Sequence, residues 1–235
     1  MNKLLLGSEC DLENLVIEED TDLVIKFNDV CKNINIIVED NVCVNVVELS
    51  YNTKNKISFI LKENSRLLYN RAIKNCNDVI SVSLDGILSS VDINNSSIND
   101  ISSNNHFYIN HNNTSTISNL SNHGINNSKD MLEFNVNVII NACGVKSITK
   151  QENKIINING GKSRILPNLL VDIDDVSANH SAYISDLDKN SMFYMNSRGI
   201  NNVEARNLLI KSFLIGNLEG FDDYIDEINI MFDFN

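Results

Sequence analysis

A short apolar segment followed by an acidic or asparagine-rich corner recurs at a nearly constant interval in the first part of the chain. The apolar segments are 15–17, 36–38 and 59–61, and the corners that follow them are 18–20, 39–41 and 62–64. Asp20 and Asn41 lie 21 residues apart, and Asn41 and Asn64 lie 23 apart. A period just above 20 residues with short strands is typical of a β-solenoid. We therefore predict a mainly β fold, a right-handed parallel β-helix in the form of a single-stranded solenoid.

The segment from Asn94 to Asn127 is rich in asparagine and permits two interpretations. One is low-complexity disorder. The other is stacked corners, because asparagine tolerates left-handed backbone conformations and its amide can bond a neighbouring coil. Apolar residues such as Ile98, Phe107 and Ile117 punctuate the segment at short intervals, which favours coils.

The pattern changes beyond Gly199. Apolar residues then follow a helical stripe, with Asn201 three residues before Glu204 as a capping arrangement. A second short helix is expected over residues 221–232. We therefore divide the chain into a β-helix over residues 1–199 and a short C-terminal α-helical appendage over residues 200–235.

Charge and composition exclude several classes of partner. The net charge of −12 argues against nucleic acid, because phosphate binding needs clustered Lys and Arg. No apolar run approaches the roughly 18 residues of a membrane span, and no secretory signal is evident at the N-terminus. The cytoplasm is the expected location. The five cysteines show no Cys-x-x-Cys spacing, and we interpret them as free thiols.

The most specific motif lies between Pro167 and Ile200. It reads PNLLVDIDDVSANHSAY from Pro167 and MFYMNSRGI from Met192. This resembles the signature of the SufB/SufD family, the scaffold subunits of SUF-type iron–sulfur cluster assembly. Upstream segments also resemble that family, in its order and spacing, over about residues 106–218. They are His111 to Asn119, with Thr116 and Ser118, and Gln151 to Asn153.

The resemblance implies a non-catalytic scaffold that pairs with a SufB- or SufD-like chain, or with itself, and docks a SufC-type ABC ATPase through its C-terminal helices. The expected partner-binding residues are Val203, Ala205, Leu209 and Phe213. Family members carry a helical region before the β-helix, whereas strand-like sequence begins here at residue 3. That departure suggests a reduced, core-only member.

Within this resemblance, His180 is the candidate ligand, for iron or for a transient iron–sulfur cluster at a subunit interface. Without the family, a histidine at a corner that bonds its own backbone is the simpler interpretation. The family's other ligand positions hold Ala178, Gly161 and Ser181, and the missing cysteine at Gly161 places the chain closer to SufD than to SufB. Cys143 is a weaker cofactor-binding candidate.

Three acidic residues near His180 also permit a divalent-metal site or a general acid–base pair. They are Asp172, Asp174 and Asp175. A corner that caps strand ends with solvated charge is the more common outcome.

Two further functions remain open. One is a SufB/SufD-like interaction protein without cluster chemistry. The other is a polysaccharide-active enzyme on a β-helix, which the absence of Trp and the aromatic content of 6% disfavour. No phosphate-binding loop or hydrolase motif occurs, so we predict that the chain is not an enzyme and that any ATPase is a separate partner.

Overall fold

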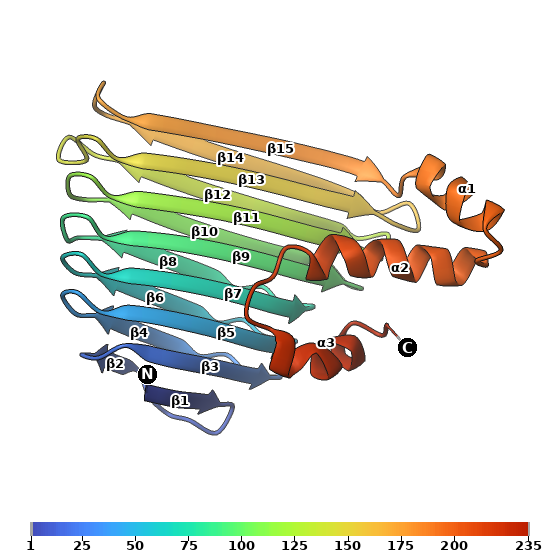
Figure 1. The fold of residues 1–235 in the computed structure, drawn as a ribbon, viewed down its shortest axis with the longest axis horizontal. Coiled ribbons are helices and arrows are strands. Elements are labelled where there is room, and N and C mark those ends of the chain that lie inside the picture. Colours follow the sequence, from blue (N-terminus) through green and yellow to red (C-terminus); the bar gives the residue numbers. More distant parts are fainter. Residues whose placement is uncertain (1, 235) are drawn as a thin grey trace.

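Fifteen strands wind into a parallel β-helix in the computed structural model, which describes residues 2–234. Consecutive strands alternate between two sheets, as Figure 1 shows. One sheet has eight strands: β1 (Asn2–Gly7), β3 (Thr21–Asn28), β5 (Cys43–Tyr51), β7 (Arg66–Lys74), β9 (Ser90–Asn99), β11 (Ile117–Asn126), β13 (Ile148–Asn157) and β15 (Ser177–Asp186). The other has seven: β2 (Asn14–Ile17), β4 (Asn33–Val38), β6 (Lys56–Leu61), β8 (Val79–Leu84), β10 (Ser103–His111), β12 (Met131–Ile140) and β14 (Lys162–Val171). The predicted mainly β, parallel solenoid is confirmed.

Coil length increases along the chain. In the first half, the Asn64 amide donates to Asn41, 23 residues earlier. Further along, the Asn119 amide donates to Asp92, 27 residues earlier, and the Ser118 hydroxyl donates to Thr149, 31 residues later. The period seen in the sequence therefore holds only for the early coils, because later coils have longer strands and corners.

Asparagine corners are stacked as the sequence suggested. Asn41 and Asn64 both adopt left-handed backbone conformations, with φ of 62° and 53°. Their side-chain amides bond across adjacent coils at 2.9 Å, which satisfies polar groups that an apolar corner would leave unpaired. The asparagine-rich segment 94–127 forms β9, β10 and β11, so the coil interpretation is confirmed.

The solenoid interior is apolar in its N-terminal part. Inward positions alternate with outward ones along each strand, as the two-residue period requires. The buried side chains include Phe27, Phe59 and Phe107, all at most 1% exposed, and they form one continuous cluster. This stacked column of apolar side chains holds the successive coils together.

The helical segment begins before the expected boundary. Strand β15 ends at Asp186 and helix α1 spans Lys189–Ser197, so the last residues assigned to the β-helix are helical. Asp188 caps α1 by accepting from the backbone N–H groups of Asn190 and Ser191. Helix α1 has no buried residue, so it lacks the apolar stripe from which a helix is recognised in a sequence.

The remaining helices follow the sequence pattern closely. Helix α2 spans Asn202–Ile215, and its expected cap, Asn201, accepts from the Glu204 N–H at 3.0 Å. A short 3-10 turn (Asp222–Tyr224) leads into α3 (Ile225–Met231), within the range expected for the second helix. Among the described residues, none of the helices combines the length and apolarity that crossing a bilayer needs.

Helices α2 and α3 lie against the eight-stranded sheet, near the carboxyl ends of its strands (Figure 1). Leu214 on α2, Ile228 on α3 and Phe232, directly after α3, share a buried cluster with Ala72 and Ile125 from the strands. The helical segment therefore completes a second apolar core with the solenoid.

Candidate functional site

The last coil leaves the interior of the solenoid open. On β14 and β15, positions in register with buried residues of the previous coil are exposed: Val171 is 39% and Ile184 is 41% exposed, whereas their partners Ile140 and Ile155 are fully buried. Terminal coils of solenoids need a polar cap or a partner. Apolar side chains at an uncapped end therefore mark a surface for another chain.

His180 lies in this open end. It pairs in register with Gln151, which is 1% exposed and belongs to the inward-facing set of β13. The imidazole therefore stands on the interior side of the last coil, exposed because no further coil covers it. His180 is within a strand, four residues into β15, and the expected corner position is wrong.

A buried, unpaired acceptor lies next to His180. The Gln151 amide nitrogen donates to the Asn168 carbonyl at 3.3 Å, but its Oε1 has no partner. An unsatisfied buried oxygen costs free energy unless a further group supplies a donor. The region around His180 therefore lacks a hydrogen-bond donor for the Gln151 oxygen.

Cys143 does not join His180. It lies in the corner between β12 and β13, where its backbone N–H donates to Asn141 and its side chain is exposed. That corner stacks on the acidic corner through a 2.7 Å bond from the Lys146 N–H to the Asp175 carbonyl. His180 is three residues beyond Ser177, where β15 leaves the corner, and this is about 10 Å along the strand.

The acidic corner is exposed to solvent. Asp172, Asp174 and Asp175 are all exposed, and the Asp172 N–H donates to the Ile140 carbonyl at 3.0 Å. Within residues 2–234, no three His, Cys, Asp or Glu side chains converge to hold a metal ion. The corner therefore closes the last coil and carries solvated charge.

The upstream motif residues form a polar network inside the solenoid. The His111 imidazole bonds the Thr116 hydroxyl at 2.7 Å and the Ser118 hydroxyl at 2.8 Å, and Ser147 and Thr149 extend this network into the next coil. His111 is fully buried, and burial lowers its pKa to about 4. These motif residues thus have a structural role in joining coils.

A buried ion cluster is the feature that the sequence analysis missed. Arg71 donates to Glu48 at 2.6 Å and to Asp78 at 2.7 Å, and all three side chains are fully buried. Burial alone would raise the pKa of Glu48, but the Arg71 charge and hydrogen bonds from Arg71, Tyr69 and Ser50 bring it below its usual value. For Asp78, burial outweighs Arg71 and raises the pKa.

From this cluster, an interior polar column runs to the last coil. Arg71 donates to Asn95, Asn95 to Asn122 at 2.7 Å, and Asn122 to Asn153 at 3.3 Å. Asn153 then donates to the carbonyl of Ser181, beside His180, at 3.4 Å. Glu48 and Arg71 lie 23 residues apart, the length of one early coil, so their spacing is a signal of stacking, although it does not show that the pair is buried.

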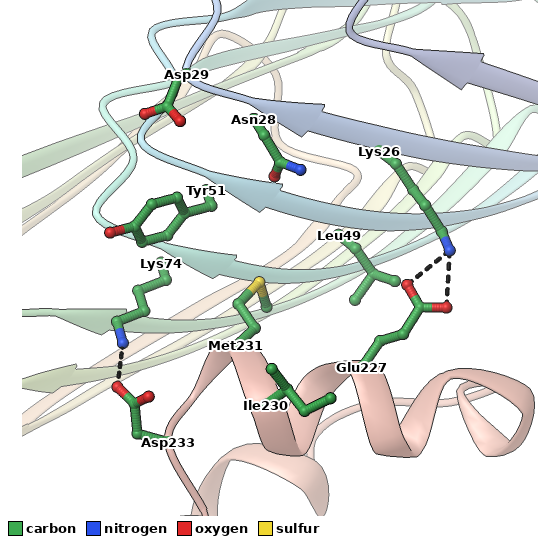
Figure 2. Close-up of a pocket in the computed structure, with 10 residues that line it drawn as sticks. All are labelled: Lys26, Asn28, Asp29, Leu49, Tyr51, Lys74, Glu227, Ile230, Met231 and Asp233. Atoms are coloured by element: carbon green, nitrogen blue, oxygen red, sulfur yellow. Dashed lines mark hydrogen bonds and ion pairs between the residues drawn. The ribbon is translucent and has the colours of Figure 1, made fainter.

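A groove of about 480 Å³ lies between α3 and the eight-stranded sheet, as Figure 2 shows. Its two lysines are already paired with carboxylates from the C-terminal segment, Lys26 with Glu227 and Lys74 with Asp233. None of its lining residues belongs to the motif segments. The ion pairs anchor α3, and we assign the groove a structural role.

The expected partner-binding residues differ in accessibility. Ala205 is fully buried, and Phe213 stacks on His123 with ring centroids 4.4 Å apart, so both face the solenoid. Leu209 is half-buried, while Val203 is 70% exposed. The apolar stripe of α2 covers the sheet, which removes Ala205 and Phe213 from a partner surface in this conformation.

Comparison with known proteins places the chain within one family. The model of the SufBD core domain, described as SUF system FeS cluster assembly, matches residues 16–213. The protein ABCI7, chloroplastic, of Arabidopsis thaliana is 49% identical over 49 residues, which are 21% of this chain and 10% of that protein. The iron-sulfur cluster assembly SufBD family protein slr0076 of Synechocystis is 45% identical over 47 residues, 20% of this chain and 10% of that protein. The aligned segment thus spans about a tenth of each curated relative.

Proposed function

Because the chain belongs to the SufBD core-domain family of SUF iron–sulfur cluster assembly, we propose that it is a non-catalytic scaffold subunit of that system. In this proposal, its last coil pairs with a SufB- or SufD-like chain, and its C-terminal helices dock a SufC-type ABC ATPase. The single observation that carries the proposal is the uncapped last coil, where His180, Val171 and Ile184 occupy interior-facing positions that no further coil covers.

The pairing step is supported by the character of the open end. At interior-facing positions, Val171 on β14 and Ile184 on β15 are 39% and 41% exposed, and Tyr183, on the outer face of the edge strand β15, is 60% exposed. A second parallel or antiparallel strand added to these edges would satisfy their free backbone groups and cover the apolar side chains. We therefore place the subunit interface there, with any cluster formed between the two chains.

The ATPase surface is proposed on α1 and the start of α2. Phe193 and Tyr194 on α1 are 76% and 59% exposed, and Val203 on α2 is 70% exposed. The far end of α2 is held to the sheet, where the Asn217 amide donates to the Asn95 carbonyl at 2.9 Å. Because this end is held to the sheet, the accessible apolar residues of these two helices lie on α1 and at the start of α2.

Removing both aromatic side chains of α1 should weaken ATPase binding. We expect Phe193→Ala with Tyr194→Ala to weaken binding of the SufC-type ATPase from the same genome by at least about tenfold, because buried aromatic anchors contribute most to interface energies. Titration calorimetry measures this. The matched control is Ile230→Ala on α3, 68% exposed, which should bind normally. Equal binding by the double variant would remove α1 from the docking surface.

His180→Ala should impair cluster formation and leave stability nearly unchanged. His180 is exposed and makes no side-chain hydrogen bond among those identified in the described residues, so the free energy of unfolding should change by less than about 0.5 kcal/mol. Anaerobic reconstitution with iron, sulfide and the partner chain, followed by visible absorbance, measures the yield. Asn179→Ala, on the opposite face of β15, is the control.

A specific observation favours one alternative. The positions at which the family carries further ligands hold Ala178, Gly161 and Ser181, none of which supplies a thiolate. If cluster yield is the same for His180→Ala and the wild type, the chain is an interaction subunit without cluster chemistry. In that case, the similarity to SufD inferred from Gly161 would reflect the ancestry of the chain and not its present function.

A further inference from the structure

Part of the outer face of the seven-stranded sheet carries almost no charge, whereas its edge at the start of β12 and β14 holds the Glu133–Arg164 ion pair and Lys162. In the part with almost no charge, the outward residues form three columns across the strands, in register from one strand to the next. The middle column consists of Asn14, Asn35, Ser58, Ser81, Tyr108, Asn137 and Asn168. Lys56 belongs to the first column, in register with Asn33 and Val79. Among the described residues of the three columns, it is the one residue with an acidic or basic side chain of the Asp, Glu, Lys or Arg type. We call this area the neutral face.

This neutrality contrasts with the rest of the molecule. The chain has 31 acidic and 19 basic residues, and its net charge is −12. Acidic residues gather at the corners beside the neutral face, including Glu39, Asp40 and Asp85. The outer face of the other sheet carries charged side chains such as Arg66 and Asp92, and α2 packs on it. A face without charge, bordered by a charged rim, has the composition of the core of a protein–protein interface.

The chemistry of the neutral face is self-complementary. Amide and hydroxyl side chains both donate and accept hydrogen bonds, so two identical copies can satisfy each other. The third column adds apolar side chains at Ile37, Ile60 and Ile139. Two such sheets can pack face to face at about 10 Å, as in β-sandwiches. Two copies of a strongly acidic chain repel each other, and contact through an uncharged surface keeps their acidic residues furthest apart.

The size of the face also suits a dimer. Seven strands about 4.8 Å apart and strands of about six residues give a face of roughly 33 by 20 Å, or about 650 Å² per copy. Two copies would bury about 1,300 Å², within the range of stable specific interfaces. We propose that the neutral face is a dimerisation surface that binds the neutral face of a second copy of this chain. This surface lies along the side of the solenoid, whereas the proposed subunit interface lies at its open end, although both include β14; it goes beyond the scaffold role proposed above.

Ser81 provides a direct test, because it lies at the centre of the face. Its strand, β8, is the fourth of the seven, and Ser81 belongs to the middle column. In a two-fold symmetric dimer, the central residue of each copy lies near that of the other. Ser81→Glu and Ser81→Lys should each weaken dimerisation by about tenfold or more, because each places like charges together. An equimolar mixture of the two variants should restore the dimer.

Sedimentation velocity over a range of concentrations measures these states. Ser90→Glu is the matched control: Ser90 is also a half-buried strand serine, but it lies on the eight-stranded sheet. We expect dimers for the wild type and for Ser90→Glu. A wild type that stays monomeric throughout, or a Ser81→Glu variant that dimerises normally, would overturn the proposal. If Tyr183→Glu abolishes the dimer and Ser81→Glu does not, the chain associates with itself through the last coil instead. This result does not depend on whether the chain binds an ATPase.

Discussion

Arg71→Met is expected to destabilise the protein by about 3–5 kcal/mol, the usual cost of removing one partner from a buried ion cluster. Methionine has a similar length, so the volume is largely kept. The substitution leaves Glu48 and Asp78 fully buried without the guanidinium that bonds both. It also removes the donor to Asn95, from which the interior polar column begins. Urea unfolding at pH 7, monitored by circular dichroism, measures the change.

The same strand provides the control. Arg66 also lies on β7 and pairs with Asp92 at 3.3 Å, but its side chain is 62% exposed. Arg66→Met should therefore cost less than about 1 kcal/mol, since solvent screens exposed ion pairs. Similar losses from the two substitutions would mean that the buried cluster contributes no more than a surface pair.

The repeating pattern predicted the fold because a solenoid is built from local rules. Each coil needs apolar residues at alternate positions and a corner residue that accepts a left-handed conformation, and Asn41 and Asn64 satisfy the second need. The same local rules located α2, whose cap and apolar stripe are both in the sequence. Helix α1 escaped prediction because it buries nothing, so no periodic apolar signal marks it.

The candidate site was only partly predictable. The motif around His180 identified the last coil, but the direction of the side chain depends on the register between β13 and β15, which the sequence does not display. The burial of Ala205 and the stacking of Phe213 on His123 likewise depend on which face of α2 meets the sheet. Both the direction of the His180 side chain and the face of α2 that packs on the sheet depend on contacts between residues far apart in the sequence. Because the coils differ in length, the sequence period does not predict these contacts.

Dependence on the strand register also explains why the buried ion cluster was missed. Arg71 contacts Glu48 from the previous coil and Asp78 from the following corner. In the sequence these residues look like ordinary surface charges in strand positions. Only a fixed register brings them to the same level of the solenoid, where each satisfies the others.

Acid should destabilise the protein through His111, by about 3 kcal/mol between pH 7 and pH 4. The folded state holds the pKa of His111 at about 4, against an ordinary value of 6.5, because the ring is buried. Below pH 6.5 the unfolded chain binds a proton that the folded chain does not, so stability falls with pH until the folded pKa is reached. Below about pH 4 both states are protonated and this contribution to the pH dependence ends.

His111→Gln isolates this contribution. Glutamine can retain some hydrogen bonding to Thr116 and Ser118 but does not titrate, so the variant should be less stable than the wild type at pH 7. That gap should shrink by about 3 kcal/mol on going to pH 4, because only the wild type loses the histidine contribution. Other titrating groups, including Glu48 and Asp78, are common to both proteins and cancel in the difference. Urea unfolding of the two proteins at several pH values measures the gap, and a gap that is constant from pH 7 to pH 4 would show that His111 titrates normally in the folded protein.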